Sequence, residues 1–338
     1  MGWTRKGRKG AFRYLDGQGR QIRDPAKVER IEQLAIPPAW KDVWISPSAK
    51  ARLQATGYDK AGRKQYLYHA EFRAAQEQAK YAGLISFAER LPELRVTMTE
   101  HLDKDELDRE RVSAIALRLI NLGWFRVGSE RYAKESRTYG ITTLTRRHVE
   151  VRGHRIRLSF RGKHSIQVRT ELVDEELAAA MRELLELPGS ARVFRYRWEG
   201  DLYNLTSARL NDYVKIYLGP EFTAKNFRTW GGTLLAAVSF AEHARRNGFP
   251  ETKTEEKRSV SAVMRRVAQQ LGNTPAVCRT SYVSPAVIEQ YLEGRTIEDF
   301  RPRHLRVVGA RELGLDAEEQ ALLSLLRSWR IRQARAAA

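Results

Sequence analysis

The sequence reads ITTLTRRHVEVRGHRIRLSFRGKHSIQV from residue 141 to residue 168. Apolar and polar residues alternate along this stretch, which is typical of half-buried β-strands. We predict short strands over residues 141–144, 148–151, 156–160 and 165–168, separated by tight turns at Arg152-Gly153-His154 and Arg161-Gly162-Lys163. The stretch therefore predicts a small antiparallel sheet.

The segments on either side of this stretch have helical periodicity. Residues 105–122 place apolar side chains three and four positions apart, and Gly123 follows as a stop signal. From about residue 171 the pattern is helical again, apart from loops near residues 217–225 and 248–257. We therefore expect the C-terminal part of the chain to be mostly helical with a short sheet.

The N-terminal part has a different pattern. Strand-like runs at residues 11–15 and 20–23 flank the turn Asp16-Gly17-Gln18-Gly19, and runs at 51–56 and 64–68 flank a second turn. A helix is predicted over residues 25–34, and another from about residue 69 to its expected end at Leu91-Pro92. The predicted fold is α+β with two lobes: a small β-rich domain at residues 1–90 and a larger, mostly helical domain at residues 91–338.

The charge of the chain points to a polyanionic partner. Its 338 residues include 60 Lys and Arg against 41 Asp and Glu, which gives a formal net charge of +19 and a pI near 10.2. Such a surplus is typical of proteins that bind nucleic acid or an anionic membrane. Residues 1–64 and residues 126–169 each carry about +9 of it. A hydrophobic share of 42% predicts a folded globular chain.

Several classes of protein are excluded by the sequence. No window of about 18 uncharged apolar residues exists, so no transmembrane span is expected. The basic N-terminus lacks the apolar core of a secretory signal. Cys278 is the single cysteine, which excludes an internal disulfide and a thiolate-rich zinc site. There is no HExxH motif and no phosphate-binding GxxxxGK[ST] loop. We expect a cytoplasmic protein with no membrane contact, metal or small-molecule cofactor.

One strand interleaves cations with aromatic residues. Arg63, Lys64, Gln65, Tyr66 and Tyr68 follow one another, and alternation places Lys64, Tyr66 and Tyr68 on one face. A hairpin of this composition fits the DNA major groove, where Gln pairs with adenine and Arg or Lys with guanine. The alternative is an amphipathic strand whose tyrosines cover a small core.

Two other features have simpler explanations. The Asp103-Lys104-Asp105-Glu106 run offers paired carboxylates of the kind that metal-dependent nucleases use. We favour a helix N-terminus instead, because acidic side chains there cap free N–H groups and complement the helix dipole. Cys278 has no partner base in the sequence, so we interpret it as a buried cysteine and not as a nucleophile.

Four short stretches form a constellation, although each alone is weak. They contain Arg126 with Tyr132 beyond it, Lys163 at a hairpin tip, Arg228 at the start of a helix, and Asn273 nine positions before Tyr282. This order of residues resembles the catalytic set of type IB DNA topoisomerases, in particular the compact poxvirus-like branch that also occurs in bacteria. The resemblance covers nearly the whole chain, and Asn-Thr-Pro-x-Val-x-Arg-x-x-Tyr at residues 273–282 is its most specific element.

The resemblance implies a role for each residue. Tyr282 would be the nucleophile that links to a DNA 3′-phosphate, Arg126 and Arg228 would stabilise the transition state with Asn273, and Lys163 would be the general acid. The family's common residue at position 273 is His, so Asn273 is a departure that keeps an N–H donor but cannot be cationic.

The resemblance also implies the fold and the partner. The C-terminal domain would be the catalytic domain, with a fold like that of tyrosine recombinases and type IB topoisomerases. Double-stranded DNA in the nucleoid would be the substrate of a monomer that clamps it, without ATP or metal. Arg63, Lys64, Gln65, Tyr66, Tyr68 and Tyr132 would contact this DNA.

Two alternatives stay open. A tyrosine site-specific recombinase has a related catalytic domain, but it usually shows His-x-x-Arg where this chain has Lys225-x-x-Arg228, and its N-terminal domain is generally helical. A non-catalytic basic DNA-binding protein would explain the charge equally well, and only the five-residue constellation speaks against it.

Overall fold

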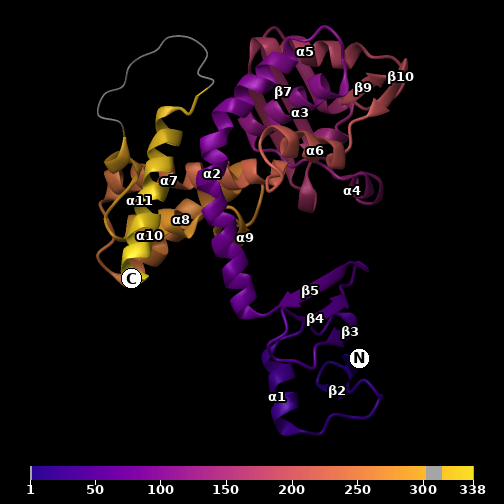
Figure 1. Cartoon of the computed structure of the whole chain (residues 1–338), viewed down its shortest axis with the longest axis vertical. Coiled ribbons are helices and arrows are strands. Elements are labelled where there is room, and N and C mark those ends of the chain that lie inside the picture. Colours follow the sequence, from indigo (N-terminus) through magenta and orange to yellow (C-terminus); the bar gives the residue numbers. More distant parts are fainter. Residues whose placement is uncertain (1, 302–313, 338) are drawn as a thin grey trace. The chain divides into compact units, whose positions relative to one another are not determined.

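The chain forms two compact units, residues 1–82 and residues 83–338 (Figure 1). The structure is a computed structural model that describes residues 2–301 and 314–337. Helix α2 (Ala70–Leu102) begins in the first unit and ends in the second. The predicted domain division after residue 90 falls inside this helix.

The first unit is a five-stranded antiparallel sheet with one helix against it. The strand order is β2-β1-β3-β4-β5. The strands are β1 (Trp3–Arg8), β2 (Ala11–Leu15), β3 (Lys41–Ile45), β4 (Leu53–Tyr58) and β5 (Lys64–Tyr68). Helix α1 (Pro25–Gln33) begins at the N-cap Asp24, whose side chain accepts hydrogen bonds from the N–H groups of Ala26 and Lys27. Its Ile31 packs with Trp3, Val43 and Ile45 in the core of the unit.

The sequence predicted this unit in part. The α1 helix and the hairpin of β4 and β5 are confirmed. The predicted strand at residues 20–23 is wrong, because β2 pairs along its length with β1 and meets the returning chain only at a Leu15–Gln21 bridge. Strands β1 and β3 were not predicted.

Helix α2 does not end at Leu91-Pro92, as the sequence predicted. It runs through Pro92 to Leu102. Proline removes one backbone hydrogen bond and crowds the preceding turn. Here the buried residues Leu91, Leu94 and Met98 continue the apolar face of the helix past the proline. Tertiary packing therefore maintains the helix where local propensity would break it.

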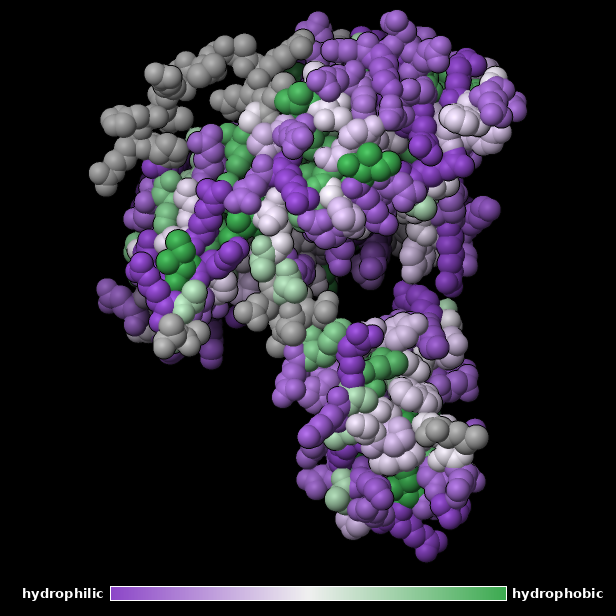
Figure 2. All heavy atoms as spheres, viewed as in Figure 1, coloured by the Kyte–Doolittle hydropathy of each residue, from purple (hydrophilic) through white to green (hydrophobic). Residues whose placement is uncertain are grey.

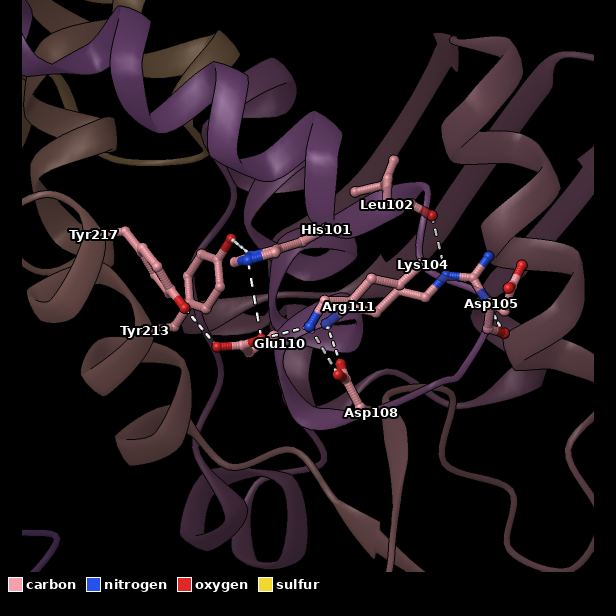
Figure 3. Close-up of polar contacts among 9 residues, drawn as sticks. All are labelled: His101, Leu102, Lys104, Asp105, Asp108, Glu110, Arg111, Tyr213 and Tyr217. Carbon is pink, nitrogen blue, oxygen red and sulfur yellow. Dashed lines mark hydrogen bonds and ion pairs between the residues drawn. The ribbon is translucent and has the colours of Figure 1, made fainter.

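The acidic run at residues 103–106 lies in the turn before α3 (Arg109–Gly123), so the helix begins later than predicted. The capping carboxylate is Asp108, which accepts a hydrogen bond from the Arg111 N–H at 2.7 Å. Lys104 donates to Asp108 and Glu110 at 2.9 and 2.5 Å, and the Asp105 carbonyl accepts from Arg111 (Figure 3). The prediction that residues 103–106 cap the helix is therefore wrong, because the capping carboxylate lies two residues beyond this run and Asp105 contributes only its backbone carbonyl to these contacts.

The second unit contains the predicted sheet. Its strands β6 (Val149–Arg152), β7 (Arg155–Arg161) and β8 (Gln167–Val173) are antiparallel and consecutive, with both predicted turns in place. Residues 141–144 are not a strand as predicted. They form a 3-10 turn, Ile141–Thr143, because the Ile141 and Thr142 N–H groups donate to the carbonyls of Arg126 and Val127 instead of to a neighbouring strand.

Beyond the sheet the second unit is mostly helical. Its remaining helices are α4 (Glu130–Glu135), α5 (Glu175–Glu186), α6 (Ser207–Tyr217), α7 (Ala224–Asn247), α8 (Lys253–Leu271), α9 (Pro275–Ser281), α10 (Pro285–Leu292) and α11 (Ala317–Ala337). A hairpin of β9 (Arg195–Trp198) and β10 (Asp201–Asn204) was missed, because its strands are only four residues long. The α+β class with a strand-rich N-terminal unit is confirmed.

The face of each unit that Figure 2 shows is largely hydrophilic. In the described part of the chain, no helix is long and apolar enough to cross a membrane. The basic end of α11 is packed at Trp329, whose indole N–H donates to Glu289 at 2.7 Å. Arg327 and Arg332 of the same helix pair with Glu89 and Glu293.

Candidate active site

Arg228 is held beneath the surface of the second unit by backbone carbonyls. It lies in the second turn of α7, whose start is set by a capping box of Thr223 and Asn226. Its side chain is 5% exposed. The guanidinium group donates to the carbonyls of Leu271, at 2.8 Å, and Trp124. Its Nε–H is buried without a hydrogen-bond partner in the described structure. A donor is therefore left over for a ligand.

Arg126 reaches the same place from the segment after α3. That helix ends at Trp124, which adopts a left-handed backbone conformation and turns the chain. The Arg126 carbonyl then accepts from the Ile141 N–H at 2.9 Å, so the 3-10 turn anchors this residue. The Arg126 side chain donates to the Gly272 carbonyl at 3.1 Å and to the Asn273 side-chain oxygen.

Asn273 lies in the tight connection between α8 and α9, and the sequence explains this connection. Gly272 ends α8 in the left-handed conformation that terminates many helices. Thr274 caps α9 through its side-chain oxygen, and Pro275 occupies the first turn, where its missing N–H costs nothing. The Asn273 Nδ2 group is buried with no hydrogen-bond partner in the described structure. Its oxygen faces Arg126, so a free N–H donor remains.

Tyr282 lies at the other end of α9, where it is the C-cap. Helix α9 separates Asn273 from Tyr282, and each end meets one of the two arginines: Asn273 binds Arg126, and the Tyr282 ring packs against Arg228. The Arg228 guanidinium carbon lies 5.1 Å from the centre of the Tyr282 ring. Cys278, also on α9, is fully buried, and burial raises the pKa of its thiol to about 11. It therefore stays neutral, which agrees with the prediction of a buried cysteine.

The two arginines, which we call the arginine pair, concentrate positive charge, and no carboxylate in the described part of the chain pairs with either one. Their hydrogen-bond acceptors are carbonyl and amide oxygens, joined for Arg228 by the Tyr282 hydroxyl. Burial, followed by the charge of Arg228, lowers the pKa of Arg126 to about 10. Burial also lowers the pKa of Arg228, and Tyr282 partly opposes this shift. Because carbonyls orient a guanidinium without neutralising it, the pair suits an anionic ligand such as a phosphate.

Lys163 lies at the turn between β7 and β8, in the 3-10 segment Lys163–Ser165, and is exposed. A pocket of about 140 Å³ connects this turn to the arginine pair, since Gly162, Ile166, Arg126 and Arg228 all line it. Lys163 itself is not among the lining residues. The structure thus brings Arg126 into contact with Asn273 and Arg228 into contact with the Tyr282 ring, and it places Lys163 on the adjoining turn.

The predicted DNA-contacting strand is the edge strand β5 of the first unit. Tyr66 and Tyr68 are 49% and 41% exposed, and their rings stack with centroids 6.3 Å apart. The Lys64 ammonium lies 5.9 Å from the Tyr66 ring centre. An exposed aromatic face does not fit the alternative in which these tyrosines cover a core.

The other predicted DNA contacts have different settings. The Asp59 carboxylate accepts hydrogen bonds from the side chains of Arg63 and Gln65, at 2.8 and 2.9 Å. Tyr132, in the second unit, lies on α4 and is 40% exposed.

Sequence reasoning missed the residues that act through their backbone. Trp124, Leu271 and Gly272 supply the carbonyls that hold the arginine pair. Their side chains carry no signal for this role, and only Gly272 is marked in the sequence, as a helix stop. Within the described ranges, no group of three or more His, Cys, Asp or Glu residues is arranged to hold a metal ion.

Comparison with known families assigns the class of protein. Residues 69–301 match the family model described as the catalytic core of eukaryotic DNA topoisomerase I, and residues 11–59 match the model of the N-terminal domain of bacterial DNA topoisomerase IB. These matches cover both units.

Individual relatives agree with this class. DNA topoisomerase 1B of Acanthamoeba polyphaga mimivirus is 31% identical over 269 residues, which is 78% of this chain and 80% of the relative. DNA topoisomerase 1B of vaccinia virus (strain Copenhagen) is 22% identical over 275 residues, 79% of this chain and 82% of that one. The chain belongs to the type IB DNA topoisomerase family.

A solved structure of XerH site-specific recombinase bound to difH substrate is also similar. The likeness covers 59% of this chain and 51% of that one, at 14% identity and a TM-score of 0.34. It is too low to support an inference about this chain.

Proposed function

We propose that the protein relaxes supercoiled DNA by cutting one strand and rejoining it, with Tyr282 as the nucleophile. The observation that carries the proposal is the arginine pair. The Arg228 guanidinium lies over the Tyr282 ring, the desolvated Arg126 binds the Asn273 side-chain oxygen, and among the described residues no carboxylate pairs with either arginine. Family membership supports the same activity.

In the proposed reaction, the Tyr282 oxygen attacks the scissile phosphorus, and the phenol proton passes to water. The bond to the 5′ oxygen breaks, and Lys163 donates a proton to that leaving oxygen. A 3′-phosphotyrosyl link results, which conserves the bond energy. The free 5′ end rotates about the intact strand under torque. Attack by the 5′-hydroxyl then releases Tyr282 and restores the strand, so neither ATP nor a metal is needed.

The arginine pair would stabilise the charge that develops on the two non-bridging oxygens. Preorganised donors of this kind supply a large part of many rate enhancements, because they need no reorganisation during the reaction. Asn273 Nδ2 would donate a further hydrogen bond to one of these oxygens. We expect its contribution to be smaller than that of either arginine, since a neutral amide forms a weaker hydrogen bond to an anion.

We further propose that both units contact one duplex as a monomeric clamp on nucleoid DNA. The Lys64, Tyr66 and Tyr68 face of β5 would enter the major groove, with Arg63 and Gln65 oriented by Asp59. Tyr132 would contact the strand near the cleavage site. If about eight phosphates are neutralised, log affinity falls with log salt at a slope of roughly −7.

A plasmid assay tests the proposed function. Wild-type protein is expected to relax a supercoiled plasmid that lacks any recombination site, in excess EDTA and without ATP, and denaturant is expected to trap a covalent protein–DNA adduct. Tyr282→Phe should abolish both. The matched control is Tyr291→Phe, because Tyr291 is fully buried and its hydroxyl has no hydrogen-bond partner in the described structure.

The outcomes separate the alternatives. Binding without any adduct would indicate a non-catalytic DNA-binding protein. Adduct formation restricted to one specific sequence, without relaxation of ordinary plasmid, would indicate a recombinase. Relaxation by Tyr282→Phe at the wild-type rate would contradict the assignment of the nucleophile.

A further inference from the structure

Helix α7 contains a second feature that bears on the site, one turn after Arg228. The sequence there is Trp230-Gly231-Gly232-Thr233. Two consecutive glycines inside a 24-residue helix run against local propensity, because each costs roughly 0.5–1 kcal/mol relative to alanine. Such a conflict between local preference and fold often marks a position where another group approaches closely.

Both glycines have such a neighbour. A Cβ atom at Gly232 would lie 2.8 Å from the Tyr282 carbonyl oxygen and 3.1 Å from the Tyr282 Cβ. A Cβ atom at Gly231 would overlap the indole ring of Trp124, the residue whose carbonyl holds Arg228. The backbone of α7 therefore touches the nucleophile's backbone on one side and the segment that leads to Arg126 on the other.

Thr233 adds hydrogen bonds to this contact. Its side chain is fully buried. The Thr233 hydroxyl lies 3.2 Å from the Tyr282 carbonyl and 2.8 Å from the Thr229 carbonyl, and its proton serves one of them at a time or is shared. The same oxygen accepts from the Ser284 N–H at 3.1 Å. One hydroxyl thus holds the chain on both sides of Val283, directly after the nucleophile.

We propose that Gly232 and Thr233 are positioning residues for Tyr282. They fix the backbone of the nucleophile on the helix that carries Arg228, so that the phenol oxygen and the arginine pair keep one spacing. The inference rests on the proposed function, because it assumes that Tyr282 is the nucleophile. The physical basis is that a displacement of about 1 Å in a reacting group can cost on the order of 10²-fold in rate.

The test is single-turnover cleavage of a duplex by variants at position 233. Thr233→Val keeps the shape of the side chain but removes the hydroxyl, and it should slow cleavage about 10- to 100-fold. Thr233→Ser should restore a rate close to that of wild type. The matched control is Ser239→Ala, because Ser239 is a buried hydroxyl on the same helix with no hydrogen-bond partner in the described structure.

Two measurements separate positioning from a general loss of structure. Equilibrium binding of the uncleaved duplex should be unchanged in Thr233→Val, and the rate is normalised to folded protein from a melting curve. Gly232→Ala provides a second variant that retains the Thr233 hydrogen bonds but crowds Tyr282, and it should also slow cleavage without weakening binding.

The substrate provides the specific readout. With a sulfur in place of the bridging 5′ oxygen, leaving-group protonation is no longer needed. Thr233→Val should stay slow on this substrate, since its defect lies in the attack. Full recovery, or wild-type cleavage by both Thr233→Val and Gly232→Ala, would overturn the inference. If Tyr282→Phe also cleaves, the proposed function itself fails.

Discussion

The arginine pair and Lys163 belong to one proposed site but lie in opposite settings. Arg228 is buried and held by the carbonyls of Trp124 and Leu271, whereas Lys163 is exposed at a turn between two strands. Groups that stabilise charge gain from being fixed before the reaction, while a proton donor needs only to reach the leaving oxygen. In the proposed site, the residue that would stabilise charge is therefore held by carbonyls, and the residue that would donate a proton is exposed.

The largest effect on cleavage is expected from substitution of Arg228, the buried residue that carbonyls hold in place. Arg228→Lys keeps the charge but loses the planar fork and its carbonyl contacts, so cleavage should fall roughly 10²–10³-fold. Single-turnover adduct formation measures it. Arg118→Lys is the control, because Arg118 pairs with Asp174 and Glu176 away from the site. Equal rates for Arg228→Lys and wild type would show that charge alone suffices.

Substitution of the exposed Lys163 should have an effect that depends on the leaving group of the substrate. Lys163→Ala is expected to slow cleavage of ordinary DNA by roughly 10²-fold, because the leaving oxygen loses its acid. On a substrate with a bridging 5′ sulfur the rate should recover, since thiolate leaves without protonation. Arg228→Lys should stay slow on that substrate. A Lys163→Ala defect that persists there would remove the general-acid role.

Asn273 is a neutral donor beside Arg126, so its substitution should slow cleavage less than substitution of Arg228 or Lys163. Asn273→Ala removes one donor to a charged ligand and should slow cleavage about tenfold. Asn273→Asp has nearly the same shape, but its carboxylate would pair with Arg126 and repel the phosphate, so it should be slower than Asn273→Ala. Asn273→His keeps a donor and should stay active. Rates from one substrate compare all three, and an active Asn273→Asp would contradict the charge argument.

The smallest effect on cleavage is expected at Glu319, which contacts helix α7, the helix that carries Arg228. Glu319 is 4% exposed, pairs with Arg95 at 2.8 Å and accepts from the Trp230 indole of α7 at 2.9 Å. Glu319→Gln leaves Arg95 without its buried partner and should lower the free energy of unfolding by about 3 kcal/mol, with little change in cleavage by the folded protein. Denaturant unfolding measures this, and Arg327→Gln at the exposed Glu89 pair is the control.

The same ion pair predicts a pH dependence of stability. Burial alone would raise the pKa of Glu319, but Arg95 and Trp230 lower it below its ordinary value of 4.5. Its contribution is therefore present above about pH 4.5 and is lost as the pH falls through the lower folded pKa. Wild type should lose more stability than Glu319→Gln between pH 5 and pH 3, and parallel profiles would contradict this assignment.

Much of the site was readable in the sequence because its chemistry depends on residue type. Arg126, Arg228, Asn273 and Tyr282 were predicted from the resemblance of their order to a known catalytic set, and the structure brings Arg126 to Asn273 and Arg228 to Tyr282. The turn that carries Lys163 was also predicted, since Arg161-Gly162-Lys163 interrupts two alternating runs. Residue order and turn residues are local features of the sequence, so they can be read without knowledge of the tertiary structure.

The errors arose where distant contacts overrule local preference. Pro92 did not end α2, because buried residues on both sides keep the helix packed. Residues 141–143 alternate like a strand but form a 3-10 turn, because their N–H groups are used by the segment around Arg126.

The sequence by itself determined the charge of the protein, its fold class, and the identity of the candidate catalytic side chains. Only the tertiary structure decided how these side chains are held. The carbonyls of Trp124, Leu271 and Gly272 orient the arginine pair, and Gly232 and Thr233 contact the Tyr282 backbone. The physical reason is that every residue has a carbonyl, so a backbone acceptor acquires its role from its position in space and leaves no mark in the sequence.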